Sequence, residues 1–191
     1  AYNKSAQFQV LSPRYMGTVG VNSLNESLRE VINPRRKGQG EVKFRHMTIR
    51  KGDRIVICQN DYQLGVFNGD LGKVNEIVWD GGRVKEIRLK IFGDPALYPV
   101  LPPGKIPHYV RLAYALTVHR FQGNETDLVL LPMVPSFSIQ LQRNLLYTAI
   151  TRAKKRVIVL GSREAVQRAI ENTRTTVRNT HFANRLQAAL T

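Results

Sequence analysis

The stretch Leu145-Leu146-Tyr147-Thr148-Ala149-Ile150-Thr151-Arg152-Ala153-Lys154-Lys155-Arg156 places an arginine between an apolar, helix-like run and the strand-like run at 157–160. An arginine at such a boundary can reach across a cleft, and its planar, permanently charged guanidinium suits phosphate oxygens. The stretch therefore predicts a helix, a turn and a strand, with Arg152 as a candidate phosphate ligand. The alternative is a surface arginine that interacts favourably with the carboxyl end of a helix dipole.

A second string upstream is Tyr114-Ala115-Leu116-Thr117-Val118-His119-Arg120-Phe121-Gln122-Gly123-Asn124-Glu125. Thr117 is predicted to end a strand and to open a helix, where its hydroxyl and the free backbone N–H groups can meet a phosphate. His119 can bind a phosphate or stack on a base, and Gly123 lets the backbone approach a ligand closely. Each residue taken alone also fits a plain structural role: a helix cap, a satisfied polar side chain and a helix stop.

Strand and helix patterns alternate in the two outer parts of the chain. In the first outer part, the predicted elements are a strand at 8–11 and a helix at 21–32 that is stopped by Asn33-Pro34. In the second, they are a strand at 127–131 closed by Pro132, a helix capped by Ser138 and reaching Ile150, and the strand at 157–160. A helix at 163–171 and a last amphipathic helix through Phe182, Leu186 and Leu190 follow. Such alternation implies an α/β domain with a parallel sheet.

The middle of the chain, residues 51–111, has a different pattern. Strand-like segments at 72–79 and 83–91 flank the tight turn Asp80-Gly81-Gly82. Five prolines between Pro95 and Pro107 are predicted to prevent regular structure in that stretch. The middle segment is therefore predicted to be a small all-β unit inserted in the α/β domain.

Composition favours a nucleic-acid-binding protein of the cytoplasm. The net charge is +15 over 191 residues, which suits a polyanion, although a solvated basic surface is the alternative. Cys58 is the single cysteine; it is predicted to be a buried strand thiol, and a chain without a possible internal disulfide favours a reducing compartment. No apolar run is long enough to span a membrane. The polar start, which leads directly into a strand, is unlike a signal peptide and suggests a fragment boundary.

The sequence lacks the residues that would hold ATP on their own. No Gly-x-x-x-x-Gly-Lys-Ser/Thr loop occurs, and no apolar run ends in the paired acids that bind magnesium. No metal site is predicted, because His46, His108 and His181 have no ligand-like spacing with Cys58. The pair Asn60-Asp61 fits turn chemistry better than a metal site.

The strings that contain Thr117 and Arg152, in this order and at this separation, resemble motifs V and VI of superfamily 1 helicases, most closely the RecD-like branch. Leu11-Ser12-Pro13-Arg14-Tyr15-Met16-Gly17 resembles motif IV, and Asn68-Gly69-Asp70-Leu71-Gly72-Lys73-Val74 resembles a turn of SH3-like barrels. The resemblance implies a RecA-like parallel-sheet domain with an inserted SH3-like β-barrel. Residues 1–50 and 112–191 would form the second RecA-like helicase domain, and residues 51–111 the insertion.

The resemblance also implies roles for individual residues. Arg152 would be the catalytic arginine finger. The DNA-binding residues would be Thr117, His119 and Arg120, and the nucleotide-binding residues Gln122, Gly123, Glu125 and Arg14. Arg14 enters because Met16 occupies the usual basic position of motif IV, and residues two apart can face the same side of an extended chain. A further departure is Phe121, where a small residue is usual.

The implied function is that of the C-terminal half of an ATP-dependent 5′-to-3′ DNA helicase, of the kind that acts in DNA repair and recombination. Its partners would be single-stranded DNA and the N-terminal RecA-like domain of the same protein, which would bind ATP and Mg²⁺. The chain alone would then be inactive as an ATPase. Two alternatives remain: a stand-alone nucleic-acid-binding module without ATPase activity, and a non-motor subunit of a recombination complex.

Overall fold

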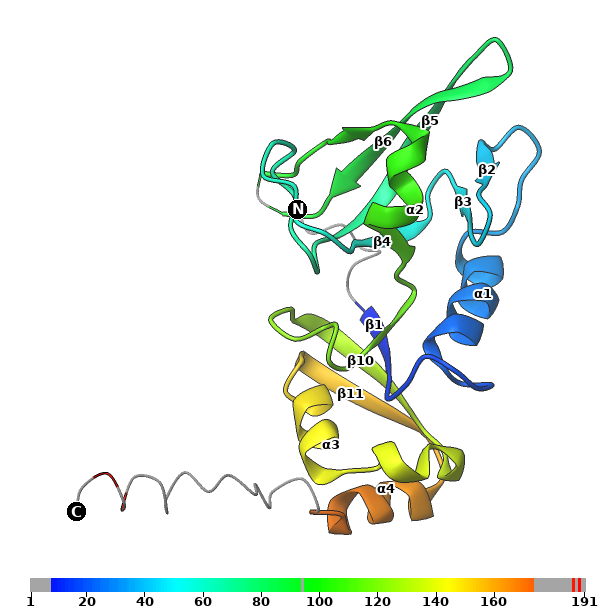
Figure 1. Cartoon of the computed structure of the whole chain (residues 1–191). Helices are drawn as coiled ribbons and strands as arrows, with labels where there is room; N and C mark the ends of the chain where they lie inside the picture. Colours follow the sequence, from blue (N-terminus) through cyan, green and yellow to red (C-terminus); the bar gives the residue numbers. More distant parts are fainter. Residues whose placement is uncertain (1–7, 94, 174–186, 188, 190–191) are drawn as a thin grey trace.

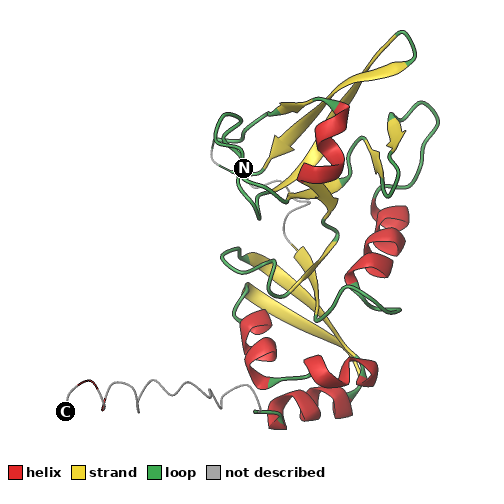
Figure 2. Ribbon diagram, viewed as in Figure 1, coloured by secondary structure: helices red, strands yellow, loops and turns green. Residues whose placement is uncertain are grey.

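The computed structural model describes residues 8–93, 95–173, 187 and 189. Figure 1 shows two lobes, a parallel sheet with helices at one end and an antiparallel β unit at the other, with helix α1 (Val21–Ile32) beside both. Figure 2 shows that strands dominate the second lobe, whereas the first mixes strands and helices. The predicted fold class, a parallel-sheet α/β domain with a small β unit, is confirmed.

The parallel sheet has the strand order β11-β10-β1-β9, and each neighbouring pair is parallel. Its strands are β1 (Phe8–Ser12), β9 (Ala115–Thr117), β10 (Thr126–Met133) and β11 (Ala153–Gly161). Leu11 and Leu131 are fully buried in a core shared with helices α3 (Arg143–Ile150) and α4 (Arg163–Glu171). Because β1 and β9 are parallel neighbours, the residues that follow Ser12 and Thr117 emerge at the same edge of the sheet.

The antiparallel sheet has the strand order β7-β6-β5-β4-β8. Its strands are β4 (Arg54–Ile57), β5 (Leu71–Asp80), β6 (Arg83–Ile91), β7 (Val100–Leu101) and β8 (Val110–Leu112), and a separate ribbon consists of β2 (Glu41–Lys43) and β3 (Thr48–Arg50). Gly81 and Gly82 connect β5 to β6 with φ angles of 56° and 80°, as the predicted tight turn requires. Val42 and Ile49 bring the ribbon into the core of this sheet.

The proline-rich stretch is more regular than its sequence predicts. It contains β7, a 3₁₀ turn, η2 (Pro103–Lys105), and the short helix α2 (Ile106–Tyr109). Prolines occupy the first positions of both turns, where a missing N–H costs no hydrogen bond. Leu101 and Ile106 are fully buried and fix the stretch on the β core. The prediction that these prolines prevent regular structure is therefore wrong.

Two local predictions in the α/β lobe are also wrong. Ser138 does not cap a helix, because it lies inside the 3₁₀ segment η3 (Pro135–Gln140), and α3 begins only after Gln142. Pro132 does not close its strand, because β10 continues to Met133; β1 pairs with β10 only as far as Leu130. The predicted last helix through Phe182, Leu186 and Leu190 lies outside the described residues.

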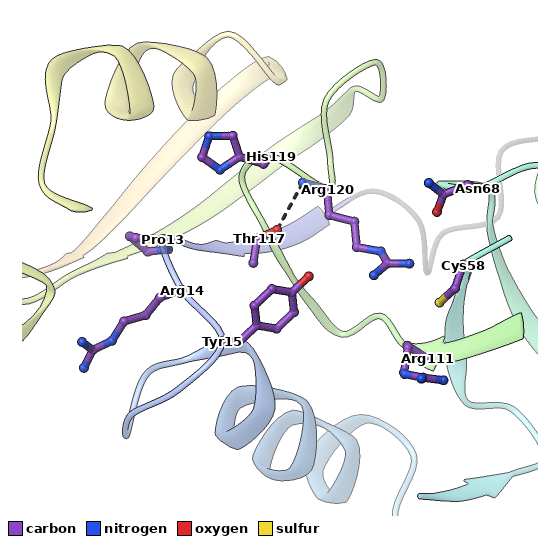
Figure 3. Close-up of a pocket in the computed structure, with 9 residues that line it drawn as sticks. All are labelled: Pro13, Arg14, Tyr15, Cys58, Asn68, Arg111, Thr117, His119 and Arg120. Atoms are coloured by element: carbon purple, nitrogen blue, oxygen red, sulfur yellow. Dashed lines mark hydrogen bonds between the residues drawn. The ribbon is translucent and has the colours of Figure 1, made fainter. Parts of the chain in front are cut away.

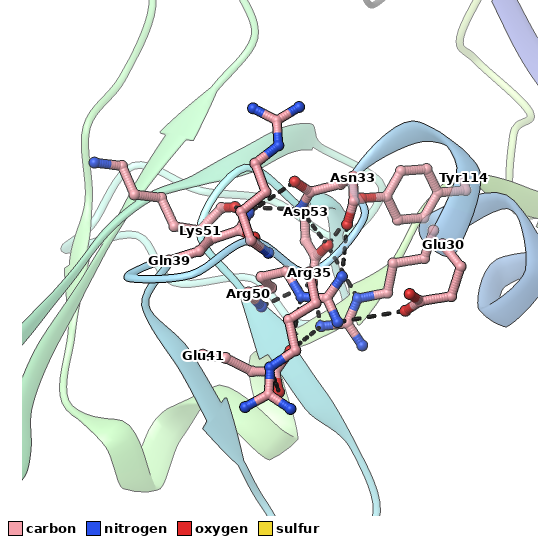
Figure 4. Close-up of polar contacts among 11 residues, drawn as sticks. Glu30, Asn33, Arg35, Gln39, Glu41, Arg50, Lys51, Asp53 and Tyr114 are labelled. Atoms are coloured by element: carbon pink, nitrogen blue, oxygen red, sulfur yellow. Dashed lines mark hydrogen bonds and ion pairs between the residues drawn. The ribbon is translucent and has the colours of Figure 1, made fainter.

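A fully buried carboxylate, that of Asp53, joins the two lobes and α1 (Figure 4). From α1, Arg29 Nε donates to Oδ1 at 3.1 Å, and Arg29 Nη2 lies 2.8 Å from Oδ2. Asn33 Nδ2 at the end of α1 and the Tyr114 hydroxyl before β9 also donate to Oδ1, each at 2.8 Å. The backbone N–H of Arg50 donates to Oδ2 at 2.8 Å. The carboxylate thus accepts four hydrogen bonds from three parts of the chain, and the second contact with Arg29 is an ion pair.

The structure predicts that Asp53→Ala lowers the free energy of unfolding by ~3–5 kcal/mol, because it leaves the Arg29 guanidinium buried without its partner. Tyr114→Phe removes one hydrogen bond and should cost only ~1 kcal/mol. Urea denaturation at neutral pH measures both. Glu26→Ala, an exposed change on α1, is the control and should stay within ~0.5 kcal/mol of the wild type. An Asp53→Ala loss as small as that of the control would contradict the joining role.

Candidate nucleic-acid interface

A pocket of about 680 Å³ is lined by residues at or after the carboxyl ends of β1 and β9 and by residues of the antiparallel lobe (Figure 3). Its lining residues are Pro13, Arg14, Tyr15, Cys58, Asn68, Arg111, Thr117, His119 and Arg120. Ligands of open α/β sheets bind outside the carboxyl ends of the strands, so this is the expected edge for a site. The pocket brings together the three predicted DNA-binding residues with Arg14.

Thr117 ends β9 as predicted, but no helix follows it. Residues 118–123 form consecutive turns instead. The Thr117 hydroxyl accepts a hydrogen bond from the Arg120 backbone N–H at 3.2 Å, which is the capping contact of a single turn. Gly123 has a φ of 85°, which favours glycine and reverses the chain toward β10. The predicted helix opening is therefore wrong, and a helix N-terminus supplies no anion binding here.

Three side chains hold the strand that carries Thr117. Asn25 of α1 grips Ala115 through both backbone groups, since its amide nitrogen donates to the Ala115 carbonyl at 3.0 Å and its oxygen accepts from the Ala115 N–H at 2.9 Å. Gln9 Nε2 donates to the carbonyl of Tyr114 at 3.2 Å. The Tyr114 hydroxyl binds Asp53; burial first, and then the charge of Asp53, raise the pKa of Tyr114 well above its usual value, so the hydroxyl stays a donor.

Three arginines make the pocket electropositive. Figure 3 shows Arg120 directed toward the side of the pocket formed by Cys58 and Arg111. The Nε atoms of Arg14 and Arg120 are buried and have no hydrogen-bond partner within the described part of the chain. The Arg14 guanidinium lies 5.3 Å from the centre of the Phe137 ring, and in Figure 3 it is directed away from Thr117 and Arg120. None of the three arginines forms an ion pair with an acid among the described residues, so the pocket keeps their positive charge.

The other predicted site residues lie at the opposite, N-terminal ends of β10 and β11. Arg152 follows α3, where its Nε donates to the Thr148 carbonyl at 3.2 Å and its backbone carbonyl accepts from the Thr126 N–H at 3.0 Å. Glu125 is paired with Lys154 at 3.3 Å. Gln122 and Gly123 are exposed in the turns that lead to this edge. Glu125 and Arg152 thus lie at one edge of the sheet, Arg14 lines the pocket, and Gln122 and Gly123 lie in the turns between the two.

Sequence reasoning misses several pocket residues. Arg111 is the last residue of the predicted insertion, and Asn68 belongs to a stretch whose pattern predicts only a turn. Tyr15 lies in the stretch that resembles motif IV, which predicts no role for it, although it is an exposed aromatic beside three arginines. Their common signal is long-range pairing: β4 pairs with β8, which sets Arg111 opposite Val56, two residues before Cys58. No local pattern contains that information.

Cys58 differs from its prediction. It lies just beyond β4, is only partly buried and lines the pocket. Turn chemistry at Asn60-Asp61 is confirmed, because Asn60 Oδ1 accepts from the Asn68 N–H and Asp61 Oδ1 accepts from the N–H groups of Gln63 and Leu64. Within the described ranges, no group of three or more His, Cys, Asp or Glu side chains is arranged to hold a metal. No helix of the described residues is both long and apolar enough to cross a membrane.

Comparison with known families finds two matches. Residues 112–160 match the UvrD-like helicase C-terminal domain, and residues 24–90 match the SH3 domain of ATP-dependent RecD-like DNA helicases. Taken together, the two matches make the chain similar to the C-terminal part of RecD-like DNA helicases. The first match covers both Thr117 and Arg152, and the second covers α1, the β2–β3 ribbon and the β5–β6 hairpin.

Curated relatives agree with these domains. The chain is 35% identical to the ATP-dependent RecD2 DNA helicase of Deinococcus radiodurans, over 94% of this chain and 23% of that protein. It is 37% identical to the RecBCD enzyme subunit RecD of Mycolicibacterium smegmatis, over 72% of this chain and 23% of that protein. The chain therefore spans about a quarter of the length of these RecD-like relatives.

Solved structures of the same fold are Pif1 helicases. The Bacteroides Pif1 helicase in complex with ADP-AlF3 and ssDNA aligns with a TM-score of 0.55 at 14% identity, over 98% of this chain and 46% of that one. The Candida albicans Pif1 helicase aligns with a TM-score of 0.54 at 14% identity, over 99% of this chain and 51% of that one. At 14% identity, these alignments show a shared fold and nothing more.

The two hydrogen bonds between Asn25 and Ala115 predict that Asn25 protects the Ala115 amide from hydrogen exchange. Asn25→Ala should speed hydrogen exchange of the Ala115 amide roughly tenfold or more, because both backbone groups of a buried strand lose their partner. Asn22→Ala on the same helix is the control, since the exposed Asn22 side chain donates to the Met16 sulfur and to no backbone group of a strand among the described residues. Hydrogen–deuterium exchange with mass spectrometry resolves the two variants. Equal protection of Ala115 in both would show that Asn25 does not hold the strand.

Proposed function

We propose that this RecD-like chain is the C-terminal motor half of an ATP-dependent DNA helicase or translocase, and that its pocket holds part of a single-stranded DNA track. The observation that carries the proposal is the pocket itself, which unites Thr117, His119 and Arg120 with Arg111 and an exposed Tyr15. Cationic grooves with aromatic side chains suit single strands, because phosphates meet the cations and bases stack on the rings. The complex of the Bacteroides Pif1 helicase with ssDNA supports the same substrate class.

We further propose that Arg152 is an arginine finger and that Gln122, Gly123 and Glu125 face the same nucleotide. Support comes from the places of Glu125 and Arg152 directly before β10 and β11, where the Thr126 N–H donates to the Arg152 carbonyl. Arg152 is only partly buried, and among the described residues its side chain contacts only Thr148 and Thr151, so its guanidinium is free to turn toward a phosphate. Arg14, which lines the pocket, is proposed to contact DNA or the phosphate end of the nucleotide only after a change of rotamer.

ATP and Mg²⁺ would be bound with a second RecA-like domain, because this sequence has neither a phosphate loop nor paired acids after an apolar run. The residues present fit half of a nucleotide site: Arg152 can stabilise charge on a transferring phosphoryl group, while magnesium ligands must come from elsewhere. The chain alone is therefore proposed to bind DNA without ATP turnover. Movement in the 5′-to-3′ direction and a cytoplasmic location remain parts of this proposal.

For the domains, we propose that residues 1–50 and 112–191 form the RecA-like unit and residues 51–111 the SH3-like insertion. The five-stranded antiparallel sheet supports these bounds, since it begins at Arg54 and ends at Leu112. The β2–β3 ribbon precedes the insertion but contributes Val42 and Ile49 to its core. The ribbon thus belongs to the first segment by sequence and to the barrel by packing.

Single-strand binding is tested with an oligothymidylate of about 15 nucleotides. Arg111→Ala and Arg120→Ala should each weaken binding several-fold, and each should reduce the log–log salt slope by about 0.7 for a lost phosphate contact. Arg163→Ala on α4, an exposed arginine away from the pocket, is the control. Fluorescence anisotropy over a range of salt concentrations gives both quantities. If all three variants behave alike, the pocket is not the single-strand site.

The finger is tested in a protein that joins this chain to its phosphate-loop domain. Arg152→Ala should lower kcat for ATP by about 10³ while leaving DNA affinity unchanged, because the contact forms chiefly in the transition state. Arg152→Lys should restore little, since an ammonium lacks the guanidinium fork. Lys155→Ala, which removes a nearby surface cation paired with Asp127, should keep kcat. Retention of about half the wild-type kcat by Arg152→Ala would make Arg152 a surface residue and favour the binding-module alternative.

A further inference from the structure

A strongly basic surface lies at the opposite end of α1 from the pocket. Segment 35–51 contains seven Lys or Arg residues and one acid, Glu41, so seven minus one gives +6 of the net +15 of the chain. Six of the cations are exposed and are here named the basic patch: Arg35, Arg36, Lys37, Lys43, Arg45 and Lys51. This charge takes no part in the pocket, whose lining residues all lie elsewhere.

Hydrogen bonds hold loop 35–40 against the ribbon that carries the other basic residues of the segment. Loop 35–40 lies over the β2–β3 ribbon, because the Lys51 N–H donates to the Gly40 carbonyl at 2.8 Å and Gln39 Nε2 donates to the Lys51 carbonyl at 2.7 Å. Figure 4 shows Lys51 directed away from the buried network. Gln39 Nε2 also donates to Asn33 Oδ1 at 2.9 Å, and Asn33 in turn donates to Asp53, so loop 35–40 is tied to the buried network.

The positive charge of the patch is not neutralised within the fold. The carboxylate of Glu41 is engaged by Arg50 Nε at 2.7 Å; burial raises the pKa of Glu41, but the hydrogen bond and charge of Arg50 outweigh it and lower the pKa below its usual value. Arg35 approaches Glu41 only at 3.9 Å. The other five patch cations have no acidic partner within 4 Å among the residues that the structure describes. The patch thus presents free cations to solvent.

The chemistry of the patch selects a partner. Segment 35–51 exposes no large apolar side chain, whereas a protein interface needs an apolar centre. Phe44 packs against the core of the antiparallel sheet, so the segment also lacks the stacking platform typical of single-strand sites. Binding of duplex DNA requires neither an apolar centre nor an aromatic platform, because the outer surface of the duplex is a regular array of phosphates that exposed Lys and Arg contact directly. We propose that the basic patch binds the phosphate backbone of double-stranded DNA.

The patch and the pocket are far enough apart to be occupied together. Tyr15 of the pocket precedes α1 and Arg35 of the patch follows it, and twelve helical residues at 1.5 Å each separate them by ~18 Å. A chain that holds a single strand in the pocket can then hold a duplex on the patch. The inference stands on the patch alone and does not require the pocket to bind DNA.

The experiment compares two triple charge reversals in the 191-residue chain. The patch variant is Arg36→Glu, Lys37→Glu and Arg45→Glu; the control is Arg156→Glu, Arg163→Glu and Arg168→Glu, all exposed and outside the patch. Three reversals remove six charges, so both variants fall from +15 to +9. Fluorescence anisotropy is measured with a blunt duplex of about 20 base pairs and with an oligothymidylate. Thermal melting confirms that both variants fold, and an Arg36→Gln, Lys37→Gln, Arg45→Gln variant provides a milder version.

The patch variant should bind the duplex at least about tenfold more weakly than the control does, and its salt slope should fall by roughly 0.9 for each lost phosphate contact. Binding of the oligothymidylate should be equal in the two variants. Equal duplex binding by both would show that only overall charge matters, and equal loss of duplex and single strand would make the patch part of a single-strand track. Either result overturns the proposal. The single-strand proposal for the pocket fails by a different result: Arg111→Ala and Arg120→Ala then leave the affinity for the oligothymidylate unchanged.

Discussion

The buried carboxylate of Asp53 is the contact on which the arrangement of the two lobes depends. It is surrounded by donors from α1, from the end of β3 and from the segment that enters β9, so all three must be in place for the charge to be satisfied. A buried ion that loses its partners costs several kcal/mol. Separation of the lobes at this point is therefore strongly opposed, and the lobes with α1 form one cooperative unit around the junction.

The same constraint shapes the site. Tyr114, which binds Asp53, lies only three residues before Thr117, and Asn25 on the helix that carries Arg29 fixes Ala115 between them. Arg111 enters the pocket from β8 on the other side of the junction. Because the chain crosses from one lobe to the other within these few residues, the geometry of the pocket is determined by the contacts of Asp53, although Asp53 does not line it.

How much the sequence predicts depends on the range of the interaction involved. The helix at Val21–Ile32, its stop at Asn33-Pro34 and the turn at Gly81-Gly82 are confirmed, because helical spacing and left-handed turn residues act locally. The helix after Thr117 is wrong, because one capping contact is compatible with a single turn as well as with a helix. Local patterns do not distinguish the two.

The proline-rich segment shows the same limit. Pro103 and Pro107 suit the first turn of a helix as well as an irregular chain, and only the burial of Leu101 and Ile106 decides between the two structures. Arg111 reaches the pocket through the pairing of β8 with β4, which is distant in sequence. The position of each predicted site residue is now known, whereas the roles of Arg152, Glu125 and Arg14 stay predictions.

The distribution of ion pairs gives the two halves of the proposed function a common physical basis. At the edge that carries Arg152, acidic side chains already balance the surface lysines, as Glu125 does for Lys154 and Asp127 for Lys155. In the pocket and on the basic patch, no such balance exists for Arg120 or Lys37 among the described residues. Uncompensated like charges repel one another and destabilise a compact state. Nucleic acid bound at each surface removes this repulsion there, so the fold gains most from nucleic acid where it leaves its own cations unpaired.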